Sequence, residues 1–111
     1  MNKPDANNSA KYEVQPEEEV TVRVKSFGVA SLAKASLDGN TIAGPPFKFT
    51  ASEPMDGLHI VVLECDFPPE PPAGARHELY VSGSRGGGEF LVTKMFPETR
   101  IKRADLKFFV R

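Results

Sequence analysis

The sequence predicts an all-β domain, folded as an antiparallel two-sheet sandwich of about seven or eight strands. From Val20 onward, apolar and polar residues alternate with a period of two, which is the pattern of a strand that has one buried and one solvated face. Glycine or proline interrupts this alternation roughly every eight to twelve residues, a spacing typical of sandwiches and barrels. A small closed β-barrel with fewer and longer strands is the alternative.

The first half of the chain predicts strands joined by tight turns. Val20–Lys25 places three valines on one face and polar side chains on the other. Val29–Leu37 fits either a strand or a helical turn, but the Asp38-Gly39 pair that follows favours a hairpin into Thr41–Ala43. A Gly-Pro-Pro break comes next, because proline cannot donate to a ladder, and Phe47–Thr50 then alternates again.

The second half contains the most apolar strand. Leu58–Phe67 is apolar on both faces, so we expect it in the middle of a sheet or covered on its second side. Pro68–Gly74 is a stiff connection long enough to carry the chain between two sheets. Glu78–Val81 and Glu89–Met95 are predicted strands on either side of a glycine-rich hairpin loop.

One segment carries a resemblance to a known family. Pro72–Gly83, Pro-Ala-Gly-Ala-Arg-His-Glu-Leu-Tyr-Val-Ser-Gly, resembles the turn and Tyr-bearing strand of many immunoglobulin-like sandwiches. The resemblance covers about a tenth of the chain and implies an immunoglobulin-like arrangement of the sheets. The chain has one cysteine and no tryptophan, so it lacks the paired cysteines and the core tryptophan of true immunoglobulin domains.

The N-terminal segment differs in composition from the rest. Residues 1–18 are polar and turn-rich, they run into three consecutive glutamates, and after Met1 only Tyr12 and Val14 are sizeable apolar residues. We therefore expect a flexible, disordered acidic tail over residues 1–18, in which Tyr12 and Val14 can add a short edge strand. A single β-sandwich domain is expected over residues 19–111.

Length, charge and cysteine content limit the class of protein. The chain has 111 residues and a net charge of −1, which gives no global attraction to nucleic acid or to an anionic membrane. With one cysteine it has no intramolecular disulfide, and no stretch has the length of a membrane span. We expect a cytoplasmic protein, although a chain trimmed of a leader would look the same.

No residue pattern predicts catalysis or metal binding. Cys65 lies among apolar residues of its strand, where burial raises the pKa of a thiol and makes it inert. His59, on the same strand, lies about 20 Å away by strand rise. His59, His77, Asp56 and Asp66 have no ligand spacing of the zinc or calcium type. The sequence therefore predicts no enzyme, no cofactor and no metal.

Two loops are candidates for contact with a partner. The run Pro68–Pro72 has Pro-x-x-Pro spacing, but the basic residue that aromatic grooves usually require is distant, so a spacer between sheets is favoured. Ser84–Gly88 could cradle an anion. It leads into a strand instead of the helix that a phosphate-binding loop needs, so a plain hairpin loop is favoured.

The C-terminal stretch Lys94–Arg111 is basic. Phe96 and Phe108 fit core positions, whereas Phe109 points outward by parity. A solvated basic face is the favoured interpretation of this stretch. Cations beside an outward ring also suit an acidic partner, the acidic tail itself, or single-stranded nucleic acid.

The favoured function is a non-enzymatic binding module whose partner is another protein, with nucleic acid unlikely. The alternative is a small anionic-ligand or single-stranded nucleic-acid binder that uses the basic C-terminal face. A monomer is expected, or a weak dimer through an exposed edge of Asp105–Val110 or Val20–Lys25. The predicted partner-binding residues are Arg85, Arg100, Lys102, Arg103 and Phe109.

Overall fold

The structure, a computed structural model, is an all-β fold. It describes residues 1–3, 11–30, 33–52, 57–98 and 102–111. Within those ranges there is no helix, and the chain forms nine strands. These are β1 (Lys11–Val14), β2 (Glu19–Phe27), β3 (Ala33–Leu37), β4 (Asn40–Ile42), β5 (Phe47–Thr50), β6 (Leu58–Cys65), β7 (Arg76–Gly83), β8 (Glu89–Met95) and β9 (Arg103–Val110).

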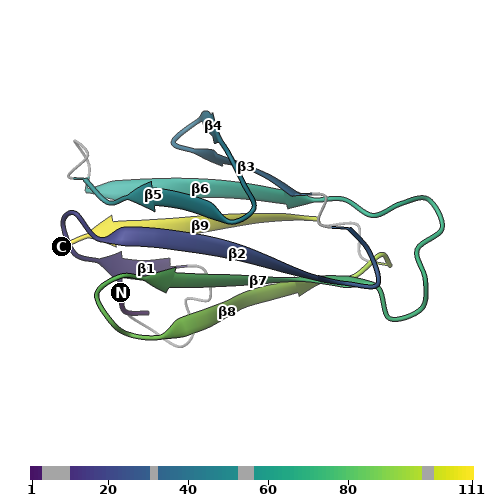
Figure 1. The fold of residues 1–111 in the computed structure, drawn as a ribbon. Coiled ribbons are helices and arrows are strands. Elements are labelled where there is room, and N and C mark those ends of the chain that lie inside the picture. Colours follow the sequence, from purple (N-terminus) through teal and green to yellow (C-terminus); the bar gives the residue numbers. More distant parts are fainter. Residues whose placement is uncertain (4–10, 31–32, 53–56, 99–101) are drawn as a thin grey trace.

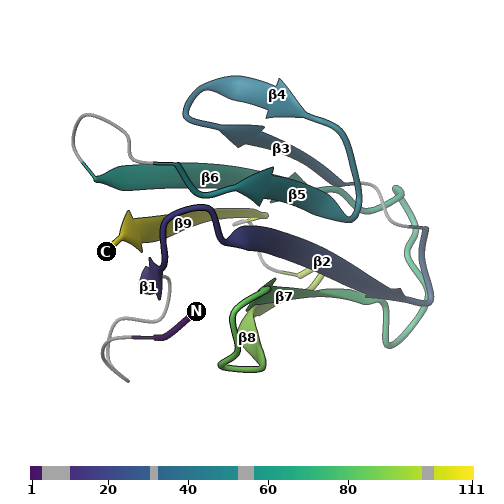
Figure 2. The ribbon, with the colours of Figure 1, turned by 60° about the vertical axis from the view of Figure 1, so that its left-hand side comes forward.

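The strands form two sheets that face each other (Figures 1 and 2). One sheet has five strands in the order β1-β9-β6-β3-β4, and the other has four in the order β5-β2-β7-β8. The predicted two-sheet sandwich is confirmed, with nine strands in the described residues instead of the seven or eight expected. The alternative of a closed barrel is wrong, because each sheet has two edge strands and the sheets do not close on each other.

Neighbouring strands pair antiparallel except β1 and β9, which run parallel. β1 lies within the segment predicted as a tail, and it forms the short edge strand that Tyr12 and Val14 allowed. It covers one side of β9, while β6 covers the other. β2 likewise lies between β5 and β7. The two strands expected to offer free edges, Val20–Lys25 and Asp105–Val110, therefore both lie inside sheets.

Three connections match their predicted roles. The β3–β4 hairpin turns at Asp38 and Gly39, whose φ angles of 50° and 89° are those that a two-residue hairpin turn requires. The proline-rich segment after β6 carries the chain from the five-stranded sheet to the four-stranded sheet. The glycine-rich segment joins β7 to β8 as a hairpin.

The inner faces of both sheets meet in one apolar core. Aromatic rings bridge its two layers: Tyr12 of β1 lies 5.6 Å from Phe108 of β9 and 5.8 Å from Phe90 of β8, and Phe108 lies 5.3 Å from Phe49 of β5 between ring centroids. These stacked, tilted and edge-on ring pairs add to the energy gained by burial. Phe96, predicted as a core residue, is instead 40% exposed, because it follows the last residue of β8 and lies past the end of the sheet.

The N-terminal residue is held inside the fold. The Met1 ammonium lies 2.9 Å from Oε2 of Glu18 and donates to the Gly86 carbonyl at 3.0 Å, and both side chains of the ion pair are fully buried. A β-carbon at Gly83 would collide with the Glu18 carboxylate. Glycine is needed at position 83 because the ion pair comes this close to the hairpin backbone.

Glu18 is stabilised as a carboxylate. Burial by itself raises the pKa of this group, but hydrogen bonds from the backbone N–H groups of Gln15 and Arg85 and the nearby Met1 ammonium outweigh burial and lower its pKa. A carboxyl pKa that is lower in the folded state stabilises the fold at neutral pH. This stabilisation is lost as the pH falls through the lowered pKa.

We expect Glu18→Gln to destabilise the fold by about 3–5 kcal/mol at pH 7, because it leaves a buried ammonium without its counter-charge. Urea unfolding measures the loss of unfolding free energy. The difference in this free energy from the unsubstituted chain narrows as the pH falls and Glu18 becomes protonated. The matched control is Glu19→Gln at the exposed neighbour, for which we expect a change close to zero. Equal effects of the two substitutions would contradict the buried ion pair.

Candidate binding face

The central strand β6 has two unlike faces. His59, Val61, Leu63 and Cys65 point into the core and are buried. The alternate residues Leu58, Ile60 and Val62 point away from the other sheet and are half-buried. The prediction that this strand lies in the middle of a sheet is confirmed.

The solvent side of the five-stranded sheet is here called the outer face. On it, Leu58 is paired in register with Phe109 of β9, and Ile60 with Lys107. Leu58, Ile60, Val62 and Phe109 form a continuous set that is called the apolar row. In Figures 1 and 2 no other described strand lies over this face, and the Arg111 guanidinium lies 5.9 Å from the centre of the Phe109 ring at its end.

Charged side chains border the apolar row, and most are already paired. Arg103 lies 2.9 Å from Asp105, Arg111 lies 3.4 Å from Glu13, and Lys34 lies 3.9 Å from Glu64. Pairs this exposed contribute little to stability. They do, however, neutralise the carboxylates of Asp105, Glu13 and Glu64.

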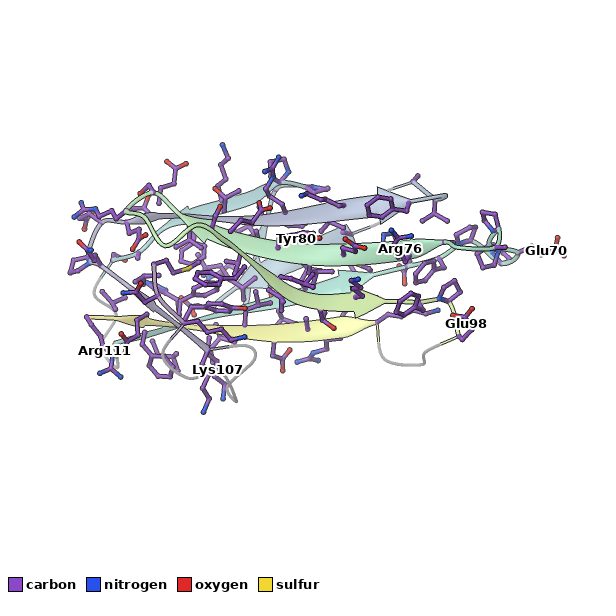
Figure 3. All side chains as sticks on the ribbon, turned by 90° about the horizontal axis from the view of Figure 1, so that it is seen from below. Glu70, Arg76, Tyr80, Glu98, Lys107 and Arg111 are labelled. Carbon is purple, nitrogen blue, oxygen red and sulfur yellow. The ribbon has the colours of Figure 1, made fainter. Side chains whose placement is uncertain are left out.

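Two lysines on the outer face have no such partner. Lys11 of β1 and Lys107 of β9 lie side by side in register, and neither forms an ion pair with any carboxylate in the described part of the chain. In Figure 3 the Lys107 side chain projects away from the sandwich, on the same side as Arg111. The outer face therefore combines an apolar row with a pair of free cations.

A shallow hollow adjoins the apolar row at the β3–β4 hairpin. Its lining includes Lys34, Ser36, Thr41, Val62 and Glu64. It is mixed in polarity and open to solvent, so it extends the outer face and does not form an enclosed ligand cavity.

The outer side of the four-stranded sheet is organised differently. Arg76 lies over the Phe27 ring at 4.0 Å, and Lys25 lies over the Tyr80 ring at 4.2 Å. Both cations also reach carboxylates, Arg76 that of Glu78 at 2.8 Å and Lys25 that of Glu89 at 3.4 Å. The hydrogen bond from Arg76 lowers the pKa of Glu78. Arg76 and Lys25 are thus paired within the chain, unlike Lys11 and Lys107.

The predicted partner-binding residues do not all lie together. Arg103 and Phe109 share the outer face, six residues apart on β9 or about 20 Å by strand rise. Lys102 lies just before β9, with its ammonium 5.4 Å from the centre of the Phe67 ring. Arg85 lies in the β7–β8 loop, where its guanidinium reaches Gln15. Arg100 falls outside the described residues.

Sequence reasoning missed the two features that define the outer face. The row Leu58, Ile60, Val62 was visible as the second apolar face of its strand, but was assigned to the core. Lys11 gave no signal, because its position beside Lys107 depends on the parallel pairing of β1 with β9.

The candidate catalytic side chains have structural partners. His59 bonds to Asp38 through Nδ1 at 2.7 Å and to the Ser52 carbonyl through Nε2 at 2.8 Å, which ties the hairpin turn to β6. His77 bonds to the Ser26 hydroxyl and the Asp66 carbonyl. In the described residues, no three His, Cys, Asp or Glu side chains gather as a metal site.

Comparisons with protein-family models, with curated proteins and with solved structures find no match to this chain. Among the described residues, no helix has the length and apolar character needed to cross a membrane.

We expect Cys65 to be unreactive in the folded protein. Its side chain is fully buried, and burial together with the nearby Asp66 carboxylate raises the pKa of the thiol to about 11. Because the thiolate is the reactive form, a thiol reagent at pH 8 should label the native chain no faster than it unfolds, and the urea-unfolded chain at once. Cys65→Ser gives the background. Rapid labelling of the native chain would contradict the burial.

Proposed function

We propose that this protein is a non-enzymatic interaction module that binds another protein through the outer face of its five-stranded sheet. The observation that carries the proposal is the apolar row on the solvent side of β6 and β9. An antiparallel sheet with one solvated face normally has polar residues there. Contiguous apolar side chains rimmed by polar ones are typical of protein–protein contact surfaces.

The size of the row limits what it does alone. The row spans about 13 Å along β6 from Leu58 to Val62. A row of this length cannot supply by itself the roughly 800 Å² of surface that each partner buries in a standard interface. A partner would therefore extend from the row onto the bordering charges, with Phe109 and Ile60 near the centre. Aromatic and aliphatic side chains at the centre, with charges at the rim, match the anatomy of protein interfaces.

A binder of an anionic ligand or of single-stranded nucleic acid is the second candidate. Lys11 and Lys107 beside Phe109 favour it. It is less well supported, because single-stranded nucleic acid is bound by several stacking rings along a basic groove, and the outer face has one ring in its described part. Affinity for an oligonucleotide would fall steeply with salt.

The finer class of the sandwich is also a proposal. The adjacent strands β3, β6 and β9 follow the order of the C, F and G strands of immunoglobulin-like sheets. The β7–β8 hairpin, inserted between β6 and β9 and paired with β2, departs from that pattern. We propose an immunoglobulin-like sandwich with this added hairpin.

The test uses the apolar row directly. A chain carrying a photo-reactive side chain at residue 62 is crosslinked in an extract of its source cells, and the captured protein is purified. Calorimetry then measures its affinity for the unsubstituted chain and for Ile60→Ser. We expect affinity to fall at least about tenfold, as for a residue near the centre of an interface.

The matched control is Leu91→Ser. Leu91 is an exposed leucine on the four-stranded sheet, and we expect its substitution to leave the affinity unchanged. Equal affinities for the unsubstituted chain and Ile60→Ser, or a loss with Leu91→Ser alone, would reject the outer face as the binding surface.

A further inference from the structure

We propose that the partner of the outer face is an acidic protein segment with apolar side chains, and that one of its carboxylates lies between Lys11 and Lys107. This inference rests on the proposed function and adds the chemistry of the partner. It is carried by the register of β1 on β9 and by the ion pairs of the outer face.

Two like charges lie side by side on the outer face. Lys11 and Lys107 are register partners on neighbouring strands, and like charges placed opposite each other destabilise a sheet. Each cation on the rest of the outer face has a carboxylate, namely Arg103, Arg111 and Lys34. Across the described residues, this lysine pair alone on that face carries an unbalanced charge. An external carboxylate bound between the two ammonium groups would relieve the repulsion.

The lysine pair also adjoins the apolar row. Lys107 lies in register with Ile60 on its other side, so the strand order places Lys11, Lys107 and Ile60 next to one another across three strands. A segment lying across β1, β9 and β6 would meet two cations and then an apolar side chain. The ligand that fits has an acidic residue and an apolar residue close together.

Charge also disfavours basic partners. A lysine or arginine placed on this part of the outer face would meet two free cations, while the neighbouring carboxylates Asp105 and Glu13 are engaged with arginines. Interfaces gain specificity from such repulsion as well as from attraction. The outer face should therefore distinguish acidic apolar segments from basic apolar ones.

The test uses three labelled peptides of about seven residues, long enough to span the row by strand rise. One has the repeat Glu-Glu-Leu-Leu, one Lys-Lys-Leu-Leu and one Glu-Glu-Ser-Ser, so that the two residue types follow each other along one side of an extended chain. Fluorescence anisotropy measures their affinity for the intact chain, at concentrations where each peptide is monomeric. We expect the glutamate–leucine peptide to bind at least roughly tenfold more tightly than either other peptide, and less tightly as salt rises.

The variants test the lysine pair itself. We expect Lys11→Glu with Lys107→Glu to reverse the preference, so that the lysine–leucine peptide binds better than the glutamate–leucine peptide. The matched control is Lys48→Glu, an exposed lysine on the outer side of β5 in the other sheet, which should change neither affinity. An unchanged preference in the double variant, or no binding of any peptide, overturns the inference.

A separate readout excludes a merely structural role for the pair. The single substitution Lys11→Glu places a negative charge in register with Lys107. It should therefore raise the melting temperature by roughly 1–4 °C and lower the affinity for the glutamate–leucine peptide. If Lys11 served only to stabilise the sheet, Lys11→Glu would instead lower the melting temperature. A lowered melting temperature overturns the argument from like charges.

Two further probes separate this partner from other anions. An oligothymidine or a vesicle with anionic headgroups that binds more tightly than the glutamate–leucine peptide overturns the inference in favour of that ligand. If the captured protein loses affinity with Ile60→Ser but not with the double lysine variant, the interaction function stands and the acidic partner is rejected. If neither variant affects its affinity, both proposals fail.

Discussion

The structure depends on one strand that is apolar on both of its faces. β6 lies in the middle of the five-stranded sheet, and its inward row, including Val61 and Leu63, is fully buried in the core. Because side chains alternate along a strand, the same residues that fix this position also place Ile60 and Val62 on the solvent side. The apolar row is therefore a direct consequence of how the sheet is built, and its partial exposure makes the outer face the candidate surface.

The N-terminal segment completes both the fold and this surface. β1 covers the edge of β9 and adds the ring of Tyr12 to the core, where burial raises the pKa of its hydroxyl. The Met1–Glu18 ion pair attaches the beginning of the chain to the β7–β8 hairpin. The same parallel pairing brings Lys11 to Lys107, so a feature of the fold also creates the unbalanced charge on the outer face. Stability and the proposed recognition are thus linked through the four residues of β1.

Local pattern was enough to predict the strands, and it failed where contacts are distant in sequence. Parity along one strand predicted the outward direction of Phe109, and an apolar run on both faces predicted the central position of β6. The Asp38-Gly39 pair correctly predicted a hairpin instead of a helix. By contrast, the direction of β1, the buried Glu18 and the pairing of Lys11 with Lys107 join segments far apart in the chain, and nothing in their own composition encodes the partner. Phe96 was misplaced because parity was extended past the end of its strand.

Solvent access to the two faces of β6 tests the account most directly. Methyl relaxation by a soluble paramagnetic probe can be measured for Ile60 and Val62 on the outer face and for Val61 and Leu63 on the inner face. The account predicts strong attenuation of the first two signals and little change in the other two, since neighbouring residues of one strand differ only in the side they face. Equal protection of all four would mean that the outer face is already covered in the free protein, and would contradict its role as a binding surface.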